Sequence, residues 1–490
     1  MSMRPIADWV LNTAAQRGAT YCDLRVVDER DRMLATKNGA VGHASESESL
    51  GVGIRVIVNG SWGFAATEEL TKDSVQAAAA QAVEIARASS AVKEHDVRLA
   101  PEKAAVVEWN SPCRVDPFST SIEQNLDLLL RIDKELRGVA GVTLAETNLH
   151  FRRYEQWFYS SEGSDIHQTR TTTGAGFNAY SFQGSEIQKR SYPNSFGGQY
   201  QNKGYELIDE LKLVENARRI GEECVALHKA DQCPEGKFDI VLDSSQLGLQ
   251  IHESIGHPIE LDRVLGMEAN FAGMSFLTLE KLRTLRYGSD LVNVVADATE
   301  RHGPGLGTFA YDDEGVPAQC TPIITNGLFT GYLSSRETAH SISEQRSNGT
   351  MRAEGWNRIP IIRMTNVSIV PGAKPLTFDQ LIGSTDHGIY FQANRSWSID
   401  DKRYNFQFGT EIGWEINGGK LGRMLKNPSY SGITTEFWNS MDAICSRDQW
   451  TLWGTPNCGK GQPMQTMGTG HGASPARFRG VTVGTAYKGS

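Results

Sequence analysis

Two histidines and a glutamate stand within six residues, in the segment His252-Glu-Ser-Ile-Gly-His-Pro258. An adjacent His and Glu followed by a second His is typical of a hydrolytic zinc helix, where both imidazoles bind the metal and the carboxylate activates water. The sequence therefore predicts His252 and His257 as metal ligands and Glu253 as general base. The alternative is that these side chains merely share a helix end, where the helix dipole favours cations.

The spacing of the two histidines differs from that of the familiar HExxH helix. Five residues at about 100° each would leave the second ring about 140° away from the first on a straight helix. Gly256 frees the backbone, and Pro258 disfavours the α conformation for His257. We therefore expect the helix to unwind or bulge at its last turn, so that His257 turns back toward a metal held by His252.

A catalytic zinc usually takes three protein ligands, so a third must come from elsewhere in the chain. The candidates are Cys458, His471, Glu260, Asp262 and Asp313. Cys458 is flanked by Gly459 and Lys460, which predicts a flexible, electropositive loop that lowers the thiol pKa. The alternatives are that Cys458 is a small buried hydrophobic residue and that His471 is an ordinary surface histidine. Asp312 and Asp313 are expected to make turn or structural hydrogen bonds.

The elements around these residues are predicted from pattern. Residues 237–242 form a strand, and 243–245 offer caps for a helix whose apolar face repeats every four residues, at Leu247, Ile251 and Ile255. His252 and Glu253 stand just off that stripe. Beyond Arg286 the chain becomes rich in β-structure. Hairpins are expected at 326–327 and 417–418, and residues 359–369 alternate between apolar and polar.

The preceding part of the chain predicts helices and strands in two units. The first has a helix at 6–17, a strand at 23–27, a turn at 38–39, a hairpin at 51–64 closed by Asn59-Gly60, and a helix capped by Thr71. A linker at 92–118 follows. The second has a capping box at 121–124 that opens a helix to Gly138, strands at 142–148, 156–160 and 175–182, and a long helix at 205–229.

We therefore predict an α+β chain with three domains. Residues 1–95 and 115–230 form N-terminal α/β units with mixed sheets and packed helices, and residues 235–490 form a β-rich C-terminal domain that carries the zinc helix. A length of 490 residues fits this number of domains.

Composition excludes several classes of protein. The net charge of -9 with dispersed basic residues argues against nucleic acid as a partner. No stretch approaches the ~20 apolar residues of a membrane span, and the start lacks a signal-peptide core. The 7 cysteines show no paired spacing, which fits a reducing compartment. We expect a soluble cytoplasmic protein with no membrane partner.

Several motifs together resemble the TldD/PmbA family of metallopeptidases, in its TldD-like branch. They lie along nearly the whole chain: Gly53-Ile-Arg-Val56, Asn59-Gly-Ser-Trp-Gly-Phe64, His252-Glu253 with His257, Tyr311-Asp-Asp-Glu-Gly-Val-Pro317, Arg363-Met-Thr-Asn366, Pro371-Gly372, Cys458-Gly-Lys-Gly-Gln462 and Val481-Thr-Val-Gly484. The resemblance implies one zinc ion held by His252, His257 and Cys458, with Glu253 as general base.

The same resemblance implies a zinc-dependent peptidase that cleaves unfolded peptides, leader segments or small peptides inside a dimer cavity. It predicts a peptide substrate in extended conformation, and either a homodimer or a heterodimer with a PmbA-like chain. The segments 394–401 and 470–474 depart from the family pattern, and both are expected near the substrate channel. Two alternatives remain: a non-catalytic regulatory subunit, since some members have been labelled modulators of DNA gyrase, and an amide hydrolase acting on a modified small molecule.

Overall fold

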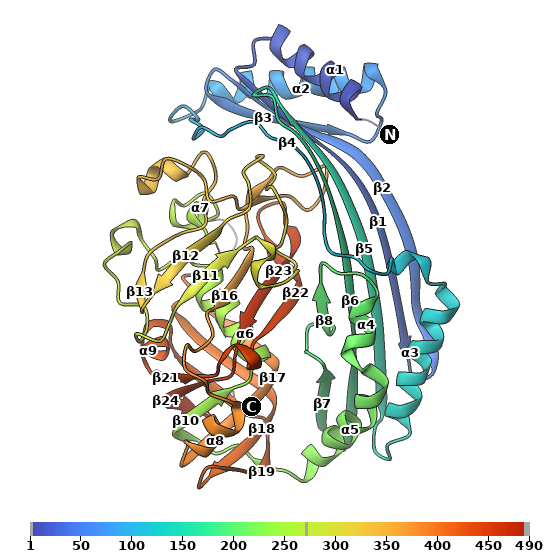
Figure 1. The fold of residues 1–490 in the computed structure, drawn as a ribbon, viewed down its shortest axis with the longest axis vertical. Coiled ribbons are helices and arrows are strands. Elements are labelled where there is room, and N and C mark those ends of the chain that lie inside the picture. Colours follow the sequence, from blue (N-terminus) through green and yellow to red (C-terminus); the bar gives the residue numbers. More distant parts are fainter. Residues whose placement is uncertain (1–2, 270–272, 485–490) are drawn as a thin grey trace.

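The computed structural model describes residues 3–269 and 273–484, which form a long curved sheet with helices on one face and a β-rich body against the other (Figure 1). Both bodies mix helices and strands, so the predicted α+β class is confirmed. Within the described ranges, no helix is both long and apolar enough to cross a membrane.

One sheet spans the first two predicted domains. Its strands run in the order β3-β2-β1-β5-β6-β4, with β7 and β8 also paired to β6. The strands are β1 (Tyr21–Lys37), β2 (Ala40–Val58), β3 (Ser61–Thr67), β4 (Val106–Asn110), β5 (Leu144–Ser160), β6 (Asp165–Gln183), β7 (Glu186–Tyr192) and β8 (Gln199–Gln201), and the helices are α1 (Arg4–Gln16), α2 (Lys72–Ser90), α3 (Ile122–Arg137), α4 (Glu206–Leu211) and α5 (Leu213–Ala226). The three predicted domain ranges stay a prediction, but the first two share this sheet.

The local signals for turns and caps are confirmed here. Asn59 and Gly60 both adopt positive φ, as a two-residue hairpin turn between β2 and β3 requires. The Thr71 hydroxyl accepts a hydrogen bond from the Ser74 N–H at the start of α2. Ser121 and Gln124 form the predicted capping box of α3, which ends before Gly138. Short-range chemistry therefore fixes where these elements begin and end.

Three predictions in this region are wrong in detail. The strands expected at 142–148 and 156–160 are one strand, β5, because β1 and β6 pair with it along nearly its whole length. The helix expected at 205–229 is interrupted at Lys212, which adopts the left-handed conformation between α4 and α5. The linker expected at 92–118 contains β4, which pairs in parallel with β6.

The two faces of the long sheet differ in chemistry. On β5, the odd-numbered Leu149, Phe151 and Trp157 pack against the helices on the outer face. Even-numbered residues point to the opposite face because side chains alternate along a strand. That inner face is polar and lies against the C-terminal body, where Gln168 of β6 donates to the Tyr311 carbonyl.

The C-terminal body contains the remaining sheets. The first combines β17 (His387–Ile399), β10 (Gly236–Leu242), β24 (Ala476–Val483), β20 (Ser429–Ile433), β18 (Asn405–Asn417), β19 (Lys420–Lys426), β9 (Asp231–Gln232) and β21 (Met441–Ile444). The second runs β13 (Leu328–Phe329), β12 (Cys320–Thr325), β11 (Val294–Asp297), β16 (Asn366–Ile369), β23 (Gln465–Ala473), β22 (Thr451–Lys460). A short pair joins β14 (Met351–Arg352) to β15 (Ile361–Ile362).

Among the described residues, the α-helices of this body are α6 (Ser244–Ile251), α7 (Leu261–Val264), α8 (Phe378–Gly383) and α9 (Thr434–Asn439). The hairpins expected at 326–327 and 417–418 are present, although Gly418 and Gly419 are the positive-φ residues of the second turn. Helix α6 lies against β23, β17 and β16 and so brings the His252 segment between the two large sheets.

Two sequence motifs meet where the bodies join. Arg55 of β2 lies 3.4 Å from Glu314, and Arg25 of β1 lies 3.4 Å from Asp313, both between buried side chains. Asp312 accepts hydrogen bonds from the backbone N–H groups of residues 314, 316 and 351, which confirms its predicted structural role. The 311–317 turn therefore docks the C-terminal body onto the inner face of the sheet.

Candidate metal centre

The helix that carries the two histidines widens at its end, as the sequence predicts. Asp243 caps α6 by accepting from the N–H groups of Ser245 and Gln246. The helix then continues as a π-helical turn over His252–Gly256, in which the His257 N–H donates to the His252 carbonyl at 3.1 Å. Because this hydrogen bond joins residues five apart, the turn brings both imidazoles to one side.

The backbone cause differs from the expected one. His257 keeps α-helical dihedrals, φ -68 and ψ -44, so Pro258 does not push it out of the α region. The wider π turn relieves the crowding that a proline ring meets against a regular helix. Gly256 packs closely against Met364: an added Cβ would lie 2.1 Å from the Met364 Sδ, so that side chain would have to move.

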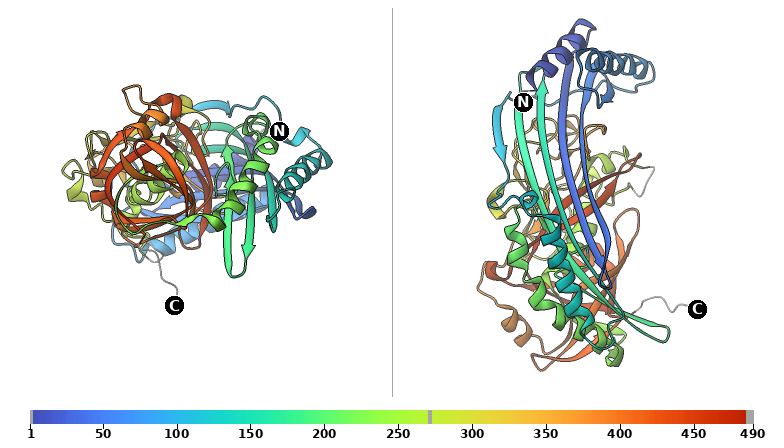
Figure 2. Two further views of the ribbon diagram at one scale, coloured as in Figure 1. Left: turned by 90° about the horizontal axis from the view of Figure 1, so that it is seen from below. Right: turned by 90° about the vertical axis from the view of Figure 1, so that its right-hand side faces the viewer.

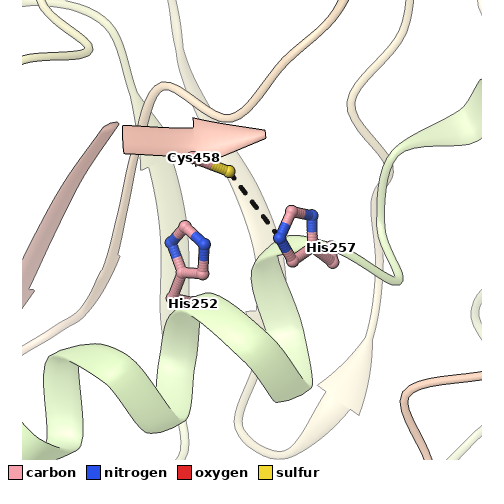
Figure 3. A group of neighbouring side chains, drawn as sticks. All are labelled: His252, His257 and Cys458. Carbon is pink, nitrogen blue, oxygen red and sulfur yellow. Dashed lines mark hydrogen bonds between the residues drawn. The ribbon is translucent and has the colours of Figure 1, made fainter. Parts of the chain in front are cut away.

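Three candidate ligands converge. The ligand atoms of His252, His257 and Cys458 lie within 4.8 Å of one another, and each residue is only 4% exposed. Figure 3 shows the two rings on the helix turning toward the sulfur on the strand above them. The Cys458 Sγ lies 3.7 Å from the His257 Nε2. Tetrahedral zinc with ordinary bond lengths separates a nitrogen and a sulfur ligand by about 3.6 Å, so the Cys458–His257 pair is spaced as the ion requires.

Cys458 lies in a strand, not in the flexible loop expected from its glycines. It belongs to β22 beside a bulge and faces Met467 of β23. Burial by itself raises the pKa of its thiol, but the buried Arg363 guanidinium and then the His257 ring outweigh that and lower it. Lys460 was the cation expected to lower the thiol pKa. It instead binds both carboxylate oxygens of Asp262 at 2.7 Å.

His471 is buried, so the expectation of a surface histidine is wrong. It is 1% exposed, and its Nε2 lies 2.7 Å from the His252 Nδ1. Its own Nδ1 lies 3.0 Å from the Val367 carbonyl, which can only accept. We therefore assign the proton to Nδ1 of His471, so that its Nε2 accepts from the His252 Nδ1–H. This tautomer leaves the His252 Nε2 free to bind a metal.

His257 is oriented by a carboxylate. Its Nδ1 lies 3.2 Å from the Glu260 Oε2, which also accepts from the Arg263 Nε at 2.6 Å. Burial by itself raises the pKa of Glu260, but Lys460 and then Arg263 outweigh it and hold that pKa well below its usual range. Glu260 therefore acts as an acceptor behind His257. Among the other candidate third ligands, Asp262 binds Lys460 and Asp313 binds the Ala353 N–H.

Burial keeps the imidazoles neutral. It lowers the pKa of both His252 and His257 to about 4, and it lowers the pKa of His471 well below its usual value. A neutral imidazole offers a lone pair, which is the form that a metal ion requires. The rings are thus prepared for a cation at neutral pH.

Glu253 faces a cation that the sequence analysis did not identify. The Arg403 Nη1 donates to the Glu253 Oε2 at 2.6 Å, and Glu253 is 5% exposed. Arg403 lies in the turn between β17 and β18, directly after the unusual 394–401 segment. The other carboxylate oxygen makes no hydrogen bond within the described residues, so it remains able to accept a proton.

The geometry brings two histidines and one cysteine together at a buried point of the larger body, where their donor atoms could hold a metal ion. Comparisons with known proteins identify the family. Residues 22–86 match the PmbA/TldA metallopeptidase domain 1, residues 115–229 the central domain and residues 235–485 the C-terminal domain of that family. The chain therefore belongs to the PmbA/TldA metallopeptidase family, and the resemblance seen in the sequence is confirmed.

Individual relatives cover nearly the whole chain. A protein named Metalloprotease from Methanothermobacter thermautotrophicus is 30% identical over 481 residues, which cover 95% of each chain. A Zinc metalloprotease TldD homolog from Saccharolobus solfataricus is 21% identical and covers 89% of this chain and 90% of its own. The crystal structure of TldE from Thermococcus kodakarensis aligns with a TM-score of 0.72 at 15% identity, over 98% of this chain and 99% of that one.

Proposed function

We propose that this protein is a zinc-dependent peptidase, with His252, His257 and Cys458 as the ligands and Glu253 as the general base. The observation that carries the proposal is the convergence of these three donors on one buried point, with His471 and Glu260 fixing the imidazole tautomers behind them. The Saccharolobus solfataricus relative is named a zinc metalloprotease, which supports zinc as the metal.

When bound there, zinc supplies a Lewis acid that makes water more acidic and polarises a peptide carbonyl. Glu253 then accepts the proton of the attacking water on its free oxygen and later donates it to the leaving amine. Arg403 holds the other oxygen of Glu253 at 2.6 Å and so fixes the carboxylate in one orientation. The low exposure of the cluster keeps bulk water away from these steps.

The substrate in this proposal is an unfolded peptide in extended conformation. Strand β22, which carries Cys458, lies at the end of its sheet, where Gln199 of β8 already binds the Leu452 carbonyl and the Gly454 N–H. The part of this edge that an added chain can pair with is the stretch after Gly454. A groove of about 510 Å³ runs beside it, lined by Asn457 and by Asn394, Arg395 and Trp397 of the unusual segment. Backbone pairing at this edge would demand little of the peptide's sequence.

Replacing Glu253 by Gln tests the proposal. We expect the variant to keep its zinc but to lose about 10²- to 10⁴-fold in peptide cleavage, because general acid–base catalysis contributes that much. The measurement combines zinc analysis with digestion of a peptide library read by mass spectrometry. Glu300→Gln, outside the site, serves as the matched control. A fully active Glu253→Gln enzyme would remove the base assignment. Cleavage of amide-bearing small molecules but of no peptide would favour the amide hydrolase.

The partner in this proposal is a second family member, either another copy of this chain or a PmbA-like chain. The likeness to TldE supports the second form. Light scattering on the chain alone, and again after co-expression with a PmbA-like chain, distinguishes the two. A monomer in both experiments contradicts the proposed dimer. A metal-free protein whose sole effect is on its partner would instead favour the regulatory subunit.

A further inference from the structure

A second cavity lies between the inner face of the long sheet and the C-terminal body. It encloses about 80 Å³ and is lined by three arginines, Arg152 of β5, Arg170 of β6 and Arg352 of β14, with Glu354 as the single acidic residue in its wall. The whole chain carries a net charge of -9, so this basic cavity differs sharply from its surroundings. A cavity lined by charge of one sign concentrates ligands of the opposite sign.

The cationic groups of this cavity are only partly neutralised. Arg152 pairs with Glu29, at 2.6 Å. Arg352 is 6% exposed and donates to the carbonyls of Met364, Gly468 and Leu306, but to no carboxylate within the described chain. Burial, and then the charge of Arg170, lower the pKa of Arg352 to about 9. A positive charge is therefore unfavourable here, and an anion would relieve it.

Two further groups have hydrogen-bonding capacity left over. Arg170 stacks on the ring of Tyr154 at 4.4 Å, and no carboxylate among the described residues pairs with it. Stacking uses the face of a guanidinium and leaves the N–H groups at its edge free to donate. The Tyr154 hydroxyl is buried, and in the described structure it has no hydrogen-bond partner. Buried hydroxyls are normally paired, so this group is available to a bound ligand or to a water molecule.

The cavity adjoins the proposed active site through the β22–β23 ladder. Met467 and Pro456 line the cavity, while Met467 is also the cross-strand neighbour of Cys458. Two residues further along β23, Thr469 lies 3.4 Å from the Nδ1 of His252. A peptide bound along this ladder would pass from the metal ligands to the arginines.

We propose that this arginine cavity binds a carboxylate of the peptide substrate, and so selects peptides that carry one beside the bond to be cleaved. The inference rests on the proposed peptidase function. The carboxylate has two sources, an acidic side chain or the C-terminus of the peptide. Charge-assisted bonds from guanidinium groups are the strong form of carboxylate recognition.

Binding and cleavage are measured separately. Fluorescence anisotropy on zinc-loaded, full-length Glu253→Gln protein uses labelled peptides in which a single Glu moves along a neutral sequence, each with a free or an amidated C-terminus. We expect a preference of about tenfold for one carboxylate position, weakening with added salt. Dependence on the Glu position identifies a side chain, and dependence on the free terminus identifies a C-terminal carboxylate.

Three variants and one control make the test specific. Arg170→Gln should abolish the preference, and Arg170→Lys should keep part of it. Tyr154→Phe should weaken it without loss of stability, since the hydroxyl has no partner within the described protein. Arg153→Gln removes the same charge from the opposite face of β5, where Arg153 pairs with Asp116, and should change nothing.

Equal affinity for neutral, amidated peptides, or an unchanged preference in Arg170→Gln, would overturn the inference. If the wild-type chain cleaves peptides without such a preference, the peptidase proposal stands and the proposed selectivity is wrong. If peptides bind with the preference but the wild-type chain cleaves none of them, the peptidase proposal is wrong and the carboxylate site stands.

Discussion

The candidate ligand cluster and the arginine cavity lie along one β-ladder, yet they differ in whether their polar groups have partners. At the cluster, each candidate ligand has a partner behind it: His471 for His252, Glu260 for His257 and Arg363 beside Cys458. In the cavity, Arg170 and the Tyr154 hydroxyl lack such partners among the residues described. The protein thus holds the first site in a single geometry and leaves the second to be completed by a ligand.

The largest effect should come from removing a ligand that has been fixed in place. Cys458→Ser replaces the thiolate by a poor zinc donor, and we expect zinc affinity to fall by more than about 100-fold, beyond the loss typical of an outer-shell change. Competition with a chelator measures it. Cys445→Ser, at another buried cysteine, is the matched control. Unchanged zinc stoichiometry in Cys458→Ser would show that another residue is the third zinc ligand.

A smaller effect should follow from removing a partner rather than a ligand. His471→Ala leaves the His252 Nδ1–H with only the longer contact to the Thr469 hydroxyl at 3.4 Å, so we expect a loss of about 10- to 100-fold in zinc affinity. His471→Gln can still accept that hydrogen bond through its side-chain carbonyl and should recover part of the loss. Cobalt substitution adds a spectroscopic measure of ligand geometry. If Ala and Gln behave alike, His471 only fills space.

The smallest effect concerns pH. Above pH 6.5 the imidazoles are neutral whether the chain is folded or unfolded. Between about pH 6.5 and pH 4, His252 and His257 bind protons in the unfolded chain but not in the folded chain, because folding lowers their pKa values to about 4. The free energy of unfolding of metal-free protein should therefore fall as pH falls through this window.

Urea denaturation at pH 7 and pH 5 measures this dependence. His471→Gln removes one buried imidazole whose pKa is lowered, so this variant should show a smaller decrease than the wild-type chain. A metal-free protein that is equally stable at both pH values would show that the cluster is already charged.

Local patterns in the sequence predicted much of this fold. Capping residues and Asn-Gly turns act over a few positions, and Thr71, Ser121 and Asn59 therefore marked their elements correctly. Interactions between residues distant in sequence were not predicted from local patterns. The two strands expected within 142–160 merged because pairing on both sides sustained β5, and pattern alone does not reveal such pairing.

The sequence contains a pattern that indicates the basic cavity. His150 and Arg152 stand at alternate positions of β5, as Arg170 and Thr172 do on β6, so each pair lies on one face. The pairing of β5 with β6 places Tyr154 opposite Arg170. This register is a property of the folded sheet and cannot be read from either strand alone.

The sequence by itself determined the chemistry at short range: an adjacent His252 and Glu253, and a second histidine five residues on. Tertiary structure decided which distant groups complete it. Cys458 and His471 reach the helix on neighbouring strands, and Arg403 reaches Glu253 from a separate turn. The physical reason is that helix geometry depends on neighbouring residues, whereas burial, tautomer and ion pairing depend on whatever the fold brings alongside.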